Sequence, residues 1–593
     1  MNWVYSKIHK KPLLVMEEKT LWGEKILYAI APDEKKVVSL PAEKSIPIGE
    51  KEVKSKEHFI YISCASRIAE ALESHLLVSP LGSNLIPLPH QLNALSEAMS
   101  GDTVRFLLAD EVGLGKTIEA GMIFKELKIR NLVKRVLIAA PKGLILQWIA
   151  EMKKHFAETF HLIIPGRSDM ENLYKVYTDR GEETERLNYW KAFDQAVCSI
   201  DSVKPLEKRK GWSDEEIERY NRERFDNLLL AGWDLIIIDE AHRVAGSSQS
   251  VARHILGRSL SHCAPYILLL SATPHSGKSD SFRRLMSLLD EETFSDEESL
   301  TKEKVSSFVI RTEKRNAIDF RGEKLFKPRH TSLHFIEWKE NDPAKKLYEA
   351  VTCYVRNGYN RAIREKNTAA GFLMVLLQRL VASSTEAIKT TLEKRLNALS
   401  SEGNLPEELE ESLEEDIDFD EISDAFRIKM ESEIEEVKNL LCLAEKCSNA
   451  GYDAKTEALL DLIYGLTSEE GELNLKFLIF TEFVATQKML QKYLSERGFS
   501  VAILNGSLGL MERTDVQRDF AEKARVLIST DAGGEGINLQ FCHIVINYDI
   551  PWAPAKLEQR IGRVDRIGQS HRVKAINFFF KDTVESRVYE VLQ

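Results

Sequence analysis

The sequence predicts an α/β protein with two parallel-sheet lobes, a helical insertion between them and a small N-terminal module. Three features predict this fold: short runs of consecutive apolar residues, helical patterns after most of these runs, and a strand-free stretch that divides the runs into two series. Strands that are apolar throughout are buried on both faces, which is typical of parallel sheets covered by helices. At 593 residues the chain is also too long for a single hydrophobic core.

The two series of apolar runs predict a first lobe at residues 86–330 and a second lobe at residues 451–593. The first series lies at 104–110, 135–141, 234–240 and 266–273, and the second at 476–481, 500–505, 525–530, 543–549 and 575–580. In such sheets, ligands bind beyond the carboxyl ends of the strands. The residues expected at these ends include Asp110, Pro141, Asp239, Thr273, Thr481 and Thr530.

Residues 331–450 are expected to form the insertion, with helices over 340–400. The basic residues of these helices either line a polyanion or belong to a solvated helix face. They are Arg356, Arg361, Arg364, Lys366, Arg379, Lys389, Lys394 and Arg395. Residues 402–436, with 16 acidic and two basic residues, are expected to form a linker or surface loop, or alternatively to mimic the charge of DNA.

Residues 1–85 precede the first lobe and are expected to form the small N-terminal module. They mix strand-like pieces with a helix-like segment at 64–77. This mixture predicts either an α+β or a β module, and it gives no indication of a role.

The composition is that of a soluble globular protein, with 43% apolar and 29% charged residues. No apolar run approaches the roughly 18 residues of a membrane span, and no secretion signal is seen, so we expect a cytoplasmic protein without membrane contact. Seven scattered cysteines without a CxxC pair argue against a zinc site or a disulfide framework. The net charge of −11 arises from the acidic segment, which carries −14, so the remaining residues are mildly basic.

The stretch "LLADEVGLGKTIEAG" at 107–121 predicts a phosphate-binding loop between a strand and a helix. Backbone N–H groups of such a loop cradle the β- and γ-phosphates at a helix N-terminus. Lys116 supplies a positive charge, and the hydroxyl of Thr117 is a ligand for Mg²⁺. A glycine-rich turn can also be purely structural, and Asp110 stands where the usual pattern has its first glycine.

The sequence "LIIIDEAH" at 235–242 places two carboxylates at the end of a buried strand. Asp239 is positioned to hold Mg²⁺, and Glu240 to take a proton from the attacking water. An Asp-Glu pair at a strand end is common by itself. Its occurrence after the phosphate loop in the same lobe favours a nucleotide-hydrolysing site.

The segment "EQRIGRVDRIGQ" at 558–569 contains Arg560, Arg563 and Arg566 at three-residue spacing. This spacing predicts one helix face, on which the three cations repel one another unless an anion neutralises them. Surface ion pairs with Glu558 and Asp565 are one alternative. The other is a set of arginine fingers directed at a γ-phosphate.

Taken in order, these motifs resemble the Swi/Snf-type helicase-like ATPases of superfamily two, within the bacterial RapA/HepA-like branch. The resemblance covers residues 86–593 and also rests on "LIPLPHQLNAL", "IAAPKGLILQWIAEM", "LLLSATP", "TEFVATQKML" and "STDAGGEGINLQFCHIVINYDIPWAP". It implies two RecA-like lobes with ATP and Mg²⁺ between them, the metal being held by Thr117 and Asp239. An initial Asp-Glu in place of the first glycine is typical of this family.

The resemblance also implies which residues act. Lys116, Asp239, Glu240, Arg563 and Arg566 are expected to be catalytic, and it says less about Arg560. The expected nucleotide contacts are His90 and Gln91 at the base, then Asp110, Glu111, Val112, Gly113, Leu114, Gly115, Lys116, Thr117, Asp531 and Gly536.

The expected function is a DNA-dependent ATPase that translocates on double-stranded DNA and remodels protein–DNA complexes. A helicase that separates DNA or RNA strands and an ATP-gated nucleic-acid-binding scaffold are the alternatives. The expected partners are duplex DNA, contacted through phosphates without base specificity, and either RNA polymerase or a protein of a phage-defence system. We expect a monomeric motor, and a fragment, because the chain stops within a predicted helix at "DTVESRVYEVLQ".

Overall fold

The computed structural model describes most of the chain. The described residues are 3–9, 11–21, 24–31, 36–47, 77–80, 83–101, 103–165, 175–177, 183–186, 188–206, 212–246, 251–274, 279–339, 342–365, 367–400, 433–534 and 536–587. By their contacts they divide into two units, one with most residues before 314 and one with most residues from 323 onward. Each unit is described by itself.

The first lobe contains a seven-stranded sheet in the order β14-β6-β13-β12-β7-β11-β8, in which every recorded pairing is parallel. The four predicted strands are present as β6 (Arg105–Leu108), β7 (Val136–Ala140), β12 (Leu235–Ile238) and β13 (Tyr266–Leu270). Alternate residues pack into different cores: Ile236 and Ile238 into one, Leu235 and Ile237 into the other. The predicted burial on both faces is therefore confirmed.

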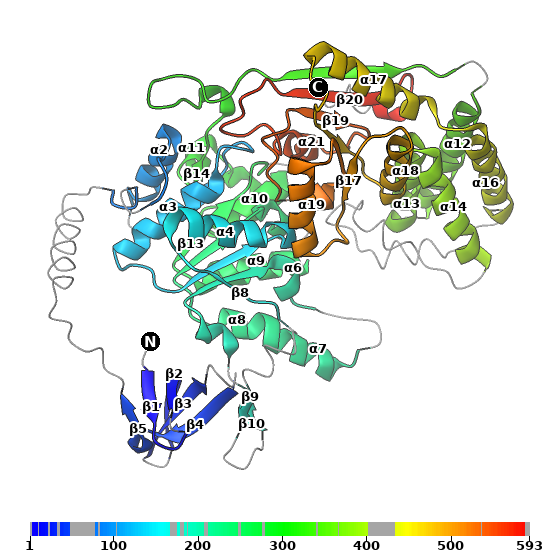
Figure 1. Ribbon diagram of the computed structural model, residues 1–593. Coiled ribbons are helices and arrows are strands. Elements are labelled where there is room, and N and C mark those ends of the chain that lie inside the picture. Colours follow the sequence, from blue (N-terminus) through cyan, green and yellow to red (C-terminus); the bar gives the residue numbers. More distant parts are fainter. Residues whose placement is uncertain are drawn as a thin grey trace. The chain divides into compact units, whose positions relative to one another are not determined.

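Three further strands of this sheet are not evident from the sequence. They are β8 (His161–Leu162), β11 (Gln195–Ser199) and β14 (Val309–Ile310). Each is too short or too polar at its ends to form a continuous apolar run. Helices surround the sheet, as Figure 1 shows: α2 (Pro89–Ala98), α3 (Lys116–Ile129), α4 (Ile145–Phe156), α6 (Ile200–Val203), α7 (Asp214–Asn221), α8 (Asn227–Leu229), α9 (Ala252–Cys263), α10 (Ser279–Ser287) and α11 (Lys302–Ser306).

The second lobe contains a six-stranded parallel sheet in the order β15-β20-β19-β16-β18-β17. The five predicted strands are present as β16 (Phe477–Phe480), β17 (Val501–Leu504), β18 (Val526–Ser529), β19 (Ile544–Asn547) and β20 (Lys574–Phe580). The helices of this lobe are α17 (Ala454–Glu470), α18 (Val484–Ser495), α19 (Leu510–Glu522), α20 (Asp531–Gly534) and α21 (Pro554–Ile561).

The sixth strand, β15 (His330–Ile336), lies far from the others in sequence, at the border between the predicted first lobe and insertion. It pairs with β20 along its whole length, from His330 opposite Lys574 to Ile336 opposite Phe580. Its alternating pattern differs from that of the buried runs because it forms the edge of the sheet. The domain boundaries otherwise stay a prediction.

The described part of the N-terminal module is a β-sheet. It contains β1 (Trp3–Ser6), β2 (Lys11–Leu21), β3 (Glu24–Ala31), β4 (Lys36–Pro41) and β5 (Ser45–Pro47). Two strands from the first-lobe region, β9 (Lys175–Tyr177) and β10 (Glu183–Arg186), extend this sheet beside β4 (Figure 1). The predicted helix-like segment at 64–77 lies outside the described residues, apart from Leu77.

The insertion is helical, as predicted, with α12 (Pro343–Arg364), α13 (Thr368–Ser383), α14 (Thr385–Ser400) and α16 (Glu433–Ala450). These helices share one apolar core. A polyanion-binding role is wrong for two of its basic residues: Arg379 pairs with Glu482 and Arg395 with Glu433, and both arginines are buried. The acidic segment 402–436 lies outside the described residues except for its last four.

Among the described residues, no helix combines the length and the apolar character that a membrane span requires. The described cysteines form no disulfide bonds, in agreement with their scattered spacing. The cytoplasmic location stays a prediction.

Gly121, the last residue of the predicted phosphate-loop stretch, lies where α3 packs on α4. A Cβ at this position would come within 2.3 Å of the Phe156 ring and 2.8 Å of the Met152 methyl group, and both side chains are fully buried. We therefore predict that Gly121→Ala lowers the free energy of unfolding by about 1 to 3 kcal/mol, because the core is overpacked. Thermal and denaturant unfolding measure this loss.

Gly465 provides the matched control, since it lies within α17 and a Cβ there meets no atom within 4 Å. Gly465→Ala should leave stability unchanged or raise it by up to about 1 kcal/mol through helix propensity. Equal stability of the two variants would contradict the packing argument.

Candidate functional site

The phosphate-loop motif lies between β6 and α3 in the first lobe. Gly113 and Gly115 have φ values of +96° and +95°, which other residues rarely adopt, and Gly115 is the N-cap of α3. Lys116 begins the helix, and its Nζ donates a hydrogen bond to the carbonyl oxygen of Asp110 at 2.8 Å. A loop of this form at a helix N-terminus is an anion-binding site.

Asp110 makes a structural contact within the first lobe. Its side chain is fully buried, and Oδ1 accepts a hydrogen bond from the Thr312 N–H at 2.6 Å. The carboxylate thus ties the end of β6 to the segment after β14, while its backbone oxygen holds Lys116. The expected contact of Asp110 with a nucleotide stays a prediction.

His90, Asp110 and Glu119 form a cluster beside the loop, with one potential ligand atom of each within 4.8 Å of the others. Burial, and then the neighbouring carboxylate of Asp110, raise the pKa of Glu119 well above its usual range, while Lys116 opposes this rise. Burial therefore favours the protonated form of Glu119. The expected contact of His90 with a nucleotide base stays a prediction.

Gln91 lies against the loop itself. Its Oε1 accepts a hydrogen bond from the Leu88 N–H at 3.0 Å, and its Nε2 would be 2.9 Å from a Cβ at position 115. The side chain is nearly fully buried. The absence of a side chain at Gly115 therefore allows α2 and the loop to approach closely.

Asp239 follows β12 and is buried. Its Oδ2 accepts a hydrogen bond from Trp148 Nε1 at 2.8 Å, and its Oδ1 accepts one from the Glu240 N–H at 2.8 Å. Burial, and then the charge of Glu240, raise the pKa of Asp239 to about 6, although Trp148 and Lys116 oppose this rise. A bound divalent cation would oppose it further, so the carboxylate fits a metal ligand.

Trp148 is the residue of this site that sequence reasoning missed. It belongs to α4 and is 1% exposed, so its apolar position in the sequence reads as an ordinary core residue. The quoted stretch "LILQWIAEM" contains it, but nothing in the spacing indicates that its N–H meets a carboxylate.

Glu240 adopts a left-handed backbone conformation, with φ +48° and ψ +49°, which is unusual for a residue other than glycine. Oε2 of Glu240 lies 3.4 Å from His242 Nδ1, and the same nitrogen lies 3.1 Å from the Ser271 hydroxyl. Ser271 directly follows β13. The turn after β12 is thereby linked to the end of the neighbouring strand.

The arginine motif of the second lobe differs from the prediction of one helix face. Helix α21 ends at Ile561, so Arg560 lies on the helix, and Arg563 and Arg566 lie on the turn that follows it. Arg560 is 2% exposed and forms a two-pronged ion pair with Asp531, at 2.5 Å and 2.9 Å. Arg560 is therefore not an arginine finger. The expected contact of Asp531 with a nucleotide stays a prediction.

The backbone of the arginine turn is anchored within the second lobe. The carbonyl oxygen of Arg563 accepts a hydrogen bond from Leu539 N–H at 3.0 Å, and Arg566 Nε donates to the carbonyl of Gly562 at 2.9 Å. Gly536, with φ +76°, follows α20. The expected roles of Arg563, Arg566 and Gly536 toward a nucleotide stay predictions.

The first lobe thus combines an anion-binding loop, a lysine at its end, a buried aspartate beside an adjacent glutamate, and a parallel sheet whose strand ends bring them together. This combination defines a nucleoside-triphosphate hydrolase of the helicase-like class.

Comparison with protein families narrows the class. The SNF2-related domain model matches residues 9–396, and the helicase conserved C-terminal domain model matches residues 454–568. The chain belongs to the SNF2-related family of helicase-like ATPases, and it is an ATP hydrolase. The match begins at residue 9, so it includes most of the N-terminal sheet, which the sequence resemblance left outside.

Two known proteins similar to this chain come from bacteria. An uncharacterized ATP-dependent helicase of Bacillus subtilis, YqhH, is 31% identical over 517 residues, which cover 85% of this chain and 77% of that protein. The RNA polymerase-associated protein RapA of Yersinia pestis is 28% identical over 529 residues, which cover 84% of this chain and 48% of RapA. The chain spans about half the length of its RapA relatives.

Two solved structures are also similar. The Hef helicase domain of Pyrococcus furiosus matches with a TM-score of 0.47 and 17% identity, over 86% of this chain and 98% of that one. The SWI2/SNF2 ATPase core of Sulfolobus solfataricus, solved in complex with double-stranded DNA, matches with a TM-score of 0.33 and 18% identity, over 86% and 91% of the two chains.

We predict that Trp148→Phe lowers both stability and ATP turnover. The substitution keeps the ring but removes the donor to the buried Asp239, which should cost about 1.5 to 3 kcal/mol of unfolding free energy. Because Asp239 loses its orientation, kcat per folded molecule should also fall. Thermal unfolding and steady-state ATPase assays measure the two effects.

Trp233→Phe is the matched control, because Trp233 is 2% exposed and donates its N–H to the backbone oxygen of Leu228 at 2.9 Å. This variant should lose stability but keep its kcat. An equal fall of kcat in both variants would contradict a specific role of Trp148 at Asp239.

Proposed function

We propose that the protein is a DNA-dependent ATPase that translocates on double-stranded DNA and remodels protein–DNA complexes. The observation that carries this proposal is the combination of the loop at Lys116 and the Asp239–Glu240 turn within an SNF2-related chain. Support also comes from similarity to YqhH, named as an ATP-dependent helicase, and to RapA, named as RNA polymerase-associated.

The residues of the first lobe divide the hydrolysis of ATP between them. The loop N–H groups and Lys116 bind the β- and γ-phosphates. Thr117, in the first turn of α3, and Asp239 are the donors for Mg²⁺, which supplies charge neutralisation at the phosphates when it is bound. Glu240 orients the attacking water and accepts its proton.

The left-handed backbone of Glu240 is compatible with this role. Its backbone conformation is left-handed, and among the described residues its buried Oε2 has no hydrogen-bond partner and lies 3.4 Å from His242 Nδ1. An acceptor held in this way is available to a water molecule. The hydrogen bond of His242 to Ser271 restrains the turn from the other side.

The second lobe contributes Arg563 and Arg566 as arginine fingers and Gly536 as a close approach to the nucleotide. An arginine finger adds about a thousandfold or more to the rate of such hydrolysis. The role of Asp531 in this proposal is reduced, because Arg560 occupies both of its carboxylate oxygens.

Duplex DNA is the proposed substrate of the motor, bound through its phosphates. The mildly basic body of the chain and the absence of a base-reading motif in the sequence support contacts of this kind. RNA polymerase, or a protein of a defence system, is the proposed partner. A helicase that separates strands remains the second candidate, on account of the name of the relative YqhH.

We predict that Glu240→Gln abolishes ATP turnover and keeps ATP binding. The amide has nearly the same shape but no longer accepts a proton, so kcat should fall by about 10² to 10⁴ while the Kd for ATP stays within about twofold. Radiolabelled phosphate release and equilibrium binding of a fluorescent ATP analogue measure the two quantities. Turnover at the wild-type rate would exclude the role assigned to Glu240.

Duplex DNA should stimulate ATP turnover more strongly than single-stranded DNA or RNA. We predict further that the protein displaces the third strand of a triplex but does not separate a labelled duplex, because translocation along the phosphates requires no unpairing. Stimulation by single strands or RNA equal to that by duplex DNA would overturn the translocase proposal, and duplex unwinding would favour the helicase.

A further inference from the structure

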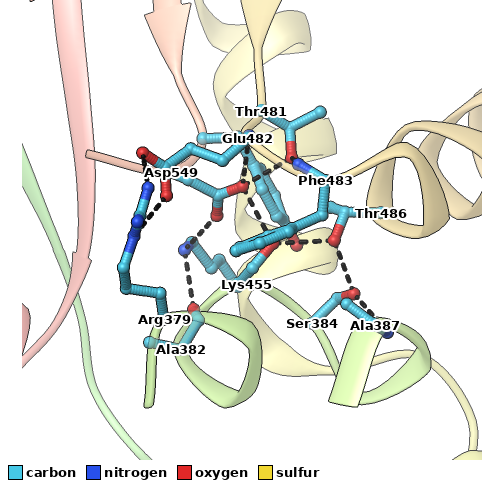
Figure 2. A network of polar contacts seen from close by, with 12 residues as sticks. Arg379, Ala382, Ser384, Ala387, Lys455, Thr481, Glu482, Phe483, Thr486 and Asp549 are labelled. Atoms are coloured by element: carbon cyan, nitrogen blue, oxygen red, sulfur yellow. Dashed lines mark hydrogen bonds and ion pairs between the residues drawn. The ribbon is translucent and has the colours of Figure 1, made fainter. Parts of the chain in front are cut away.

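A buried set of charged side chains lies where the helical insertion meets the carboxyl ends of the second sheet (Figure 2). On one side, Arg379 of α13 forms a two-pronged contact with Glu482, which follows β16: Nε lies 3.1 Å from Oε2 and Nη2 lies 2.8 Å from Oε1. The exposed fractions of the two side chains are 7% and 4%. The pair therefore joins the insertion to the sheet without solvent between them.

Asp549, which follows β19, lies at the centre of this set. Its Oδ1 lies 3.3 Å from Lys455 Nζ, and its Oδ2 accepts hydrogen bonds from the Ser383 hydroxyl at 2.8 Å and the Glu482 N–H at 3.1 Å. The Thr481 hydroxyl donates to the same oxygen. Figure 2 shows Lys455, Thr481 and Glu482 around the carboxylate.

The backbone at the end of α13 makes a further polar contact with this set. Lys455 Nζ donates to the carbonyl oxygen of Ala382 at 3.0 Å while it pairs with Asp549. Lys455 is 0% exposed, so each of these contacts compensates for the desolvation of its charge.

The set continues from Asp549 to the arginine motif. Nη1 of Arg560 donates to the backbone oxygen of Asp549, while Nε and Nη2 bind Asp531. Arg560 lies on the last turn of α21, three residues before Arg563. A continuous series of contacts thus runs from α13, through Glu482 and Asp549, to the helix that precedes the arginine turn.

Three cations and three carboxylates balance in this set: Arg379, Lys455 and Arg560 against Glu482, Asp549 and Asp531. A fourth carboxyl group, Glu585, is buried beside them, and burial, followed by the charges of Asp549 and Glu482, raises its pKa to about 7 although Lys455 opposes the rise. Buried ion pairs seldom add stability compared with well-packed apolar side chains, but they specify one geometry.

We propose that this buried set is a positioning device by which the helical insertion controls the orientation of the arginine turn 562–566. The proposal rests on the function proposed above for Arg563 and Arg566. Movement of α13 displaces Arg379 and Ser383, their partners Glu482 and Asp549 follow, and Arg560 transfers the displacement to the end of α21. The arginines thereby reach their catalytic orientation only when the insertion is correctly docked.

The test uses the double variant Arg379→Met, Glu482→Met in the full chain. It removes the Arg379–Glu482 pair, which is one of the contacts between α13 and the set, without leaving an unpaired buried charge, so the protein should keep its melting temperature. We expect the Kd for an ATP analogue to stay within about twofold, and kcat with saturating duplex DNA to fall by about tenfold to a hundredfold, since small misplacements of catalytic groups have effects of this size. Amide hydrogen exchange over 562–566 should become faster.

Asp549→Asn is the second variant, which removes one charge at the centre of the set and should show the same separation of Kd from kcat. The control is Glu558→Gln. Glu558 also lies on helix α21 and forms an exposed ion pair with Arg329 at 2.6 Å, which the substitution removes. The control should keep the wild-type kcat and exchange rate.

The proposal is overturned if kcat stays within about twofold of the wild type in both test variants. It is also overturned if kcat falls only in proportion to the fraction of molecules that still bind ATP. A wild-type protein that hydrolyses no ATP with duplex DNA would overturn the proposed function as well. An active wild type with equally active variants would overturn the positioning role alone.

Discussion

The parallel arrangement of fully buried strands is the constraint on which the rest of the structure depends. Because helices cover the central strands, most side chains of these strands are apolar, and charged side chains occur mainly where the strands end. In the first lobe, β6, β12 and β13 are followed within two residues by Asp110, Asp239 and Ser271; in the second, β16, β18 and β19 are followed within two residues by Thr481, Asp531 and Asp549. One edge of each sheet therefore concentrates charge.

The two lobes stabilise these charges in different ways. In the first lobe the carboxylate of Asp239 accepts hydrogen bonds from neutral donors, the N–H groups of Trp148 and Glu240, while burial raises the pKa values of Asp239 and Glu119. In the second lobe the carboxylates are paired with arginine or lysine, and the pKa of Asp531 is lowered despite its burial, chiefly by Arg560. Carboxylates that are bound by neutral donors favour an incoming cation. Carboxylates that are paired with arginine or lysine are already neutralised, and they favour a fixed geometry.

The sequence indicates those features of the site that depend on adjacent residues, and it does not indicate those that depend on distant partners. The loop at Lys116 and the Asp239–Glu240 turn are local features, so their geometry follows from adjacent residues. The role of Asp110 depends on Thr312, that of Arg560 on Asp531, and that of Arg379 on Glu482, and these partners lie 202, 29 and 103 residues away. A charged residue in a motif has the same appearance in the sequence whether its partner is a ligand or another part of the chain.

The sequence by itself determined the two parallel sheets, nine of their strands, the helical insertion and the family, because runs of consecutive apolar residues and short motifs are local signals. Only the tertiary structure decided that β15 completes the second sheet, that β9 and β10 extend the N-terminal sheet, and that Trp148 holds Asp239. It also decided that Arg379, Arg395 and Arg560 are buried in ion pairs. The physical reason is that burial, strand pairing and charge neutralisation depend on partners distant in the chain, which no local pattern specifies.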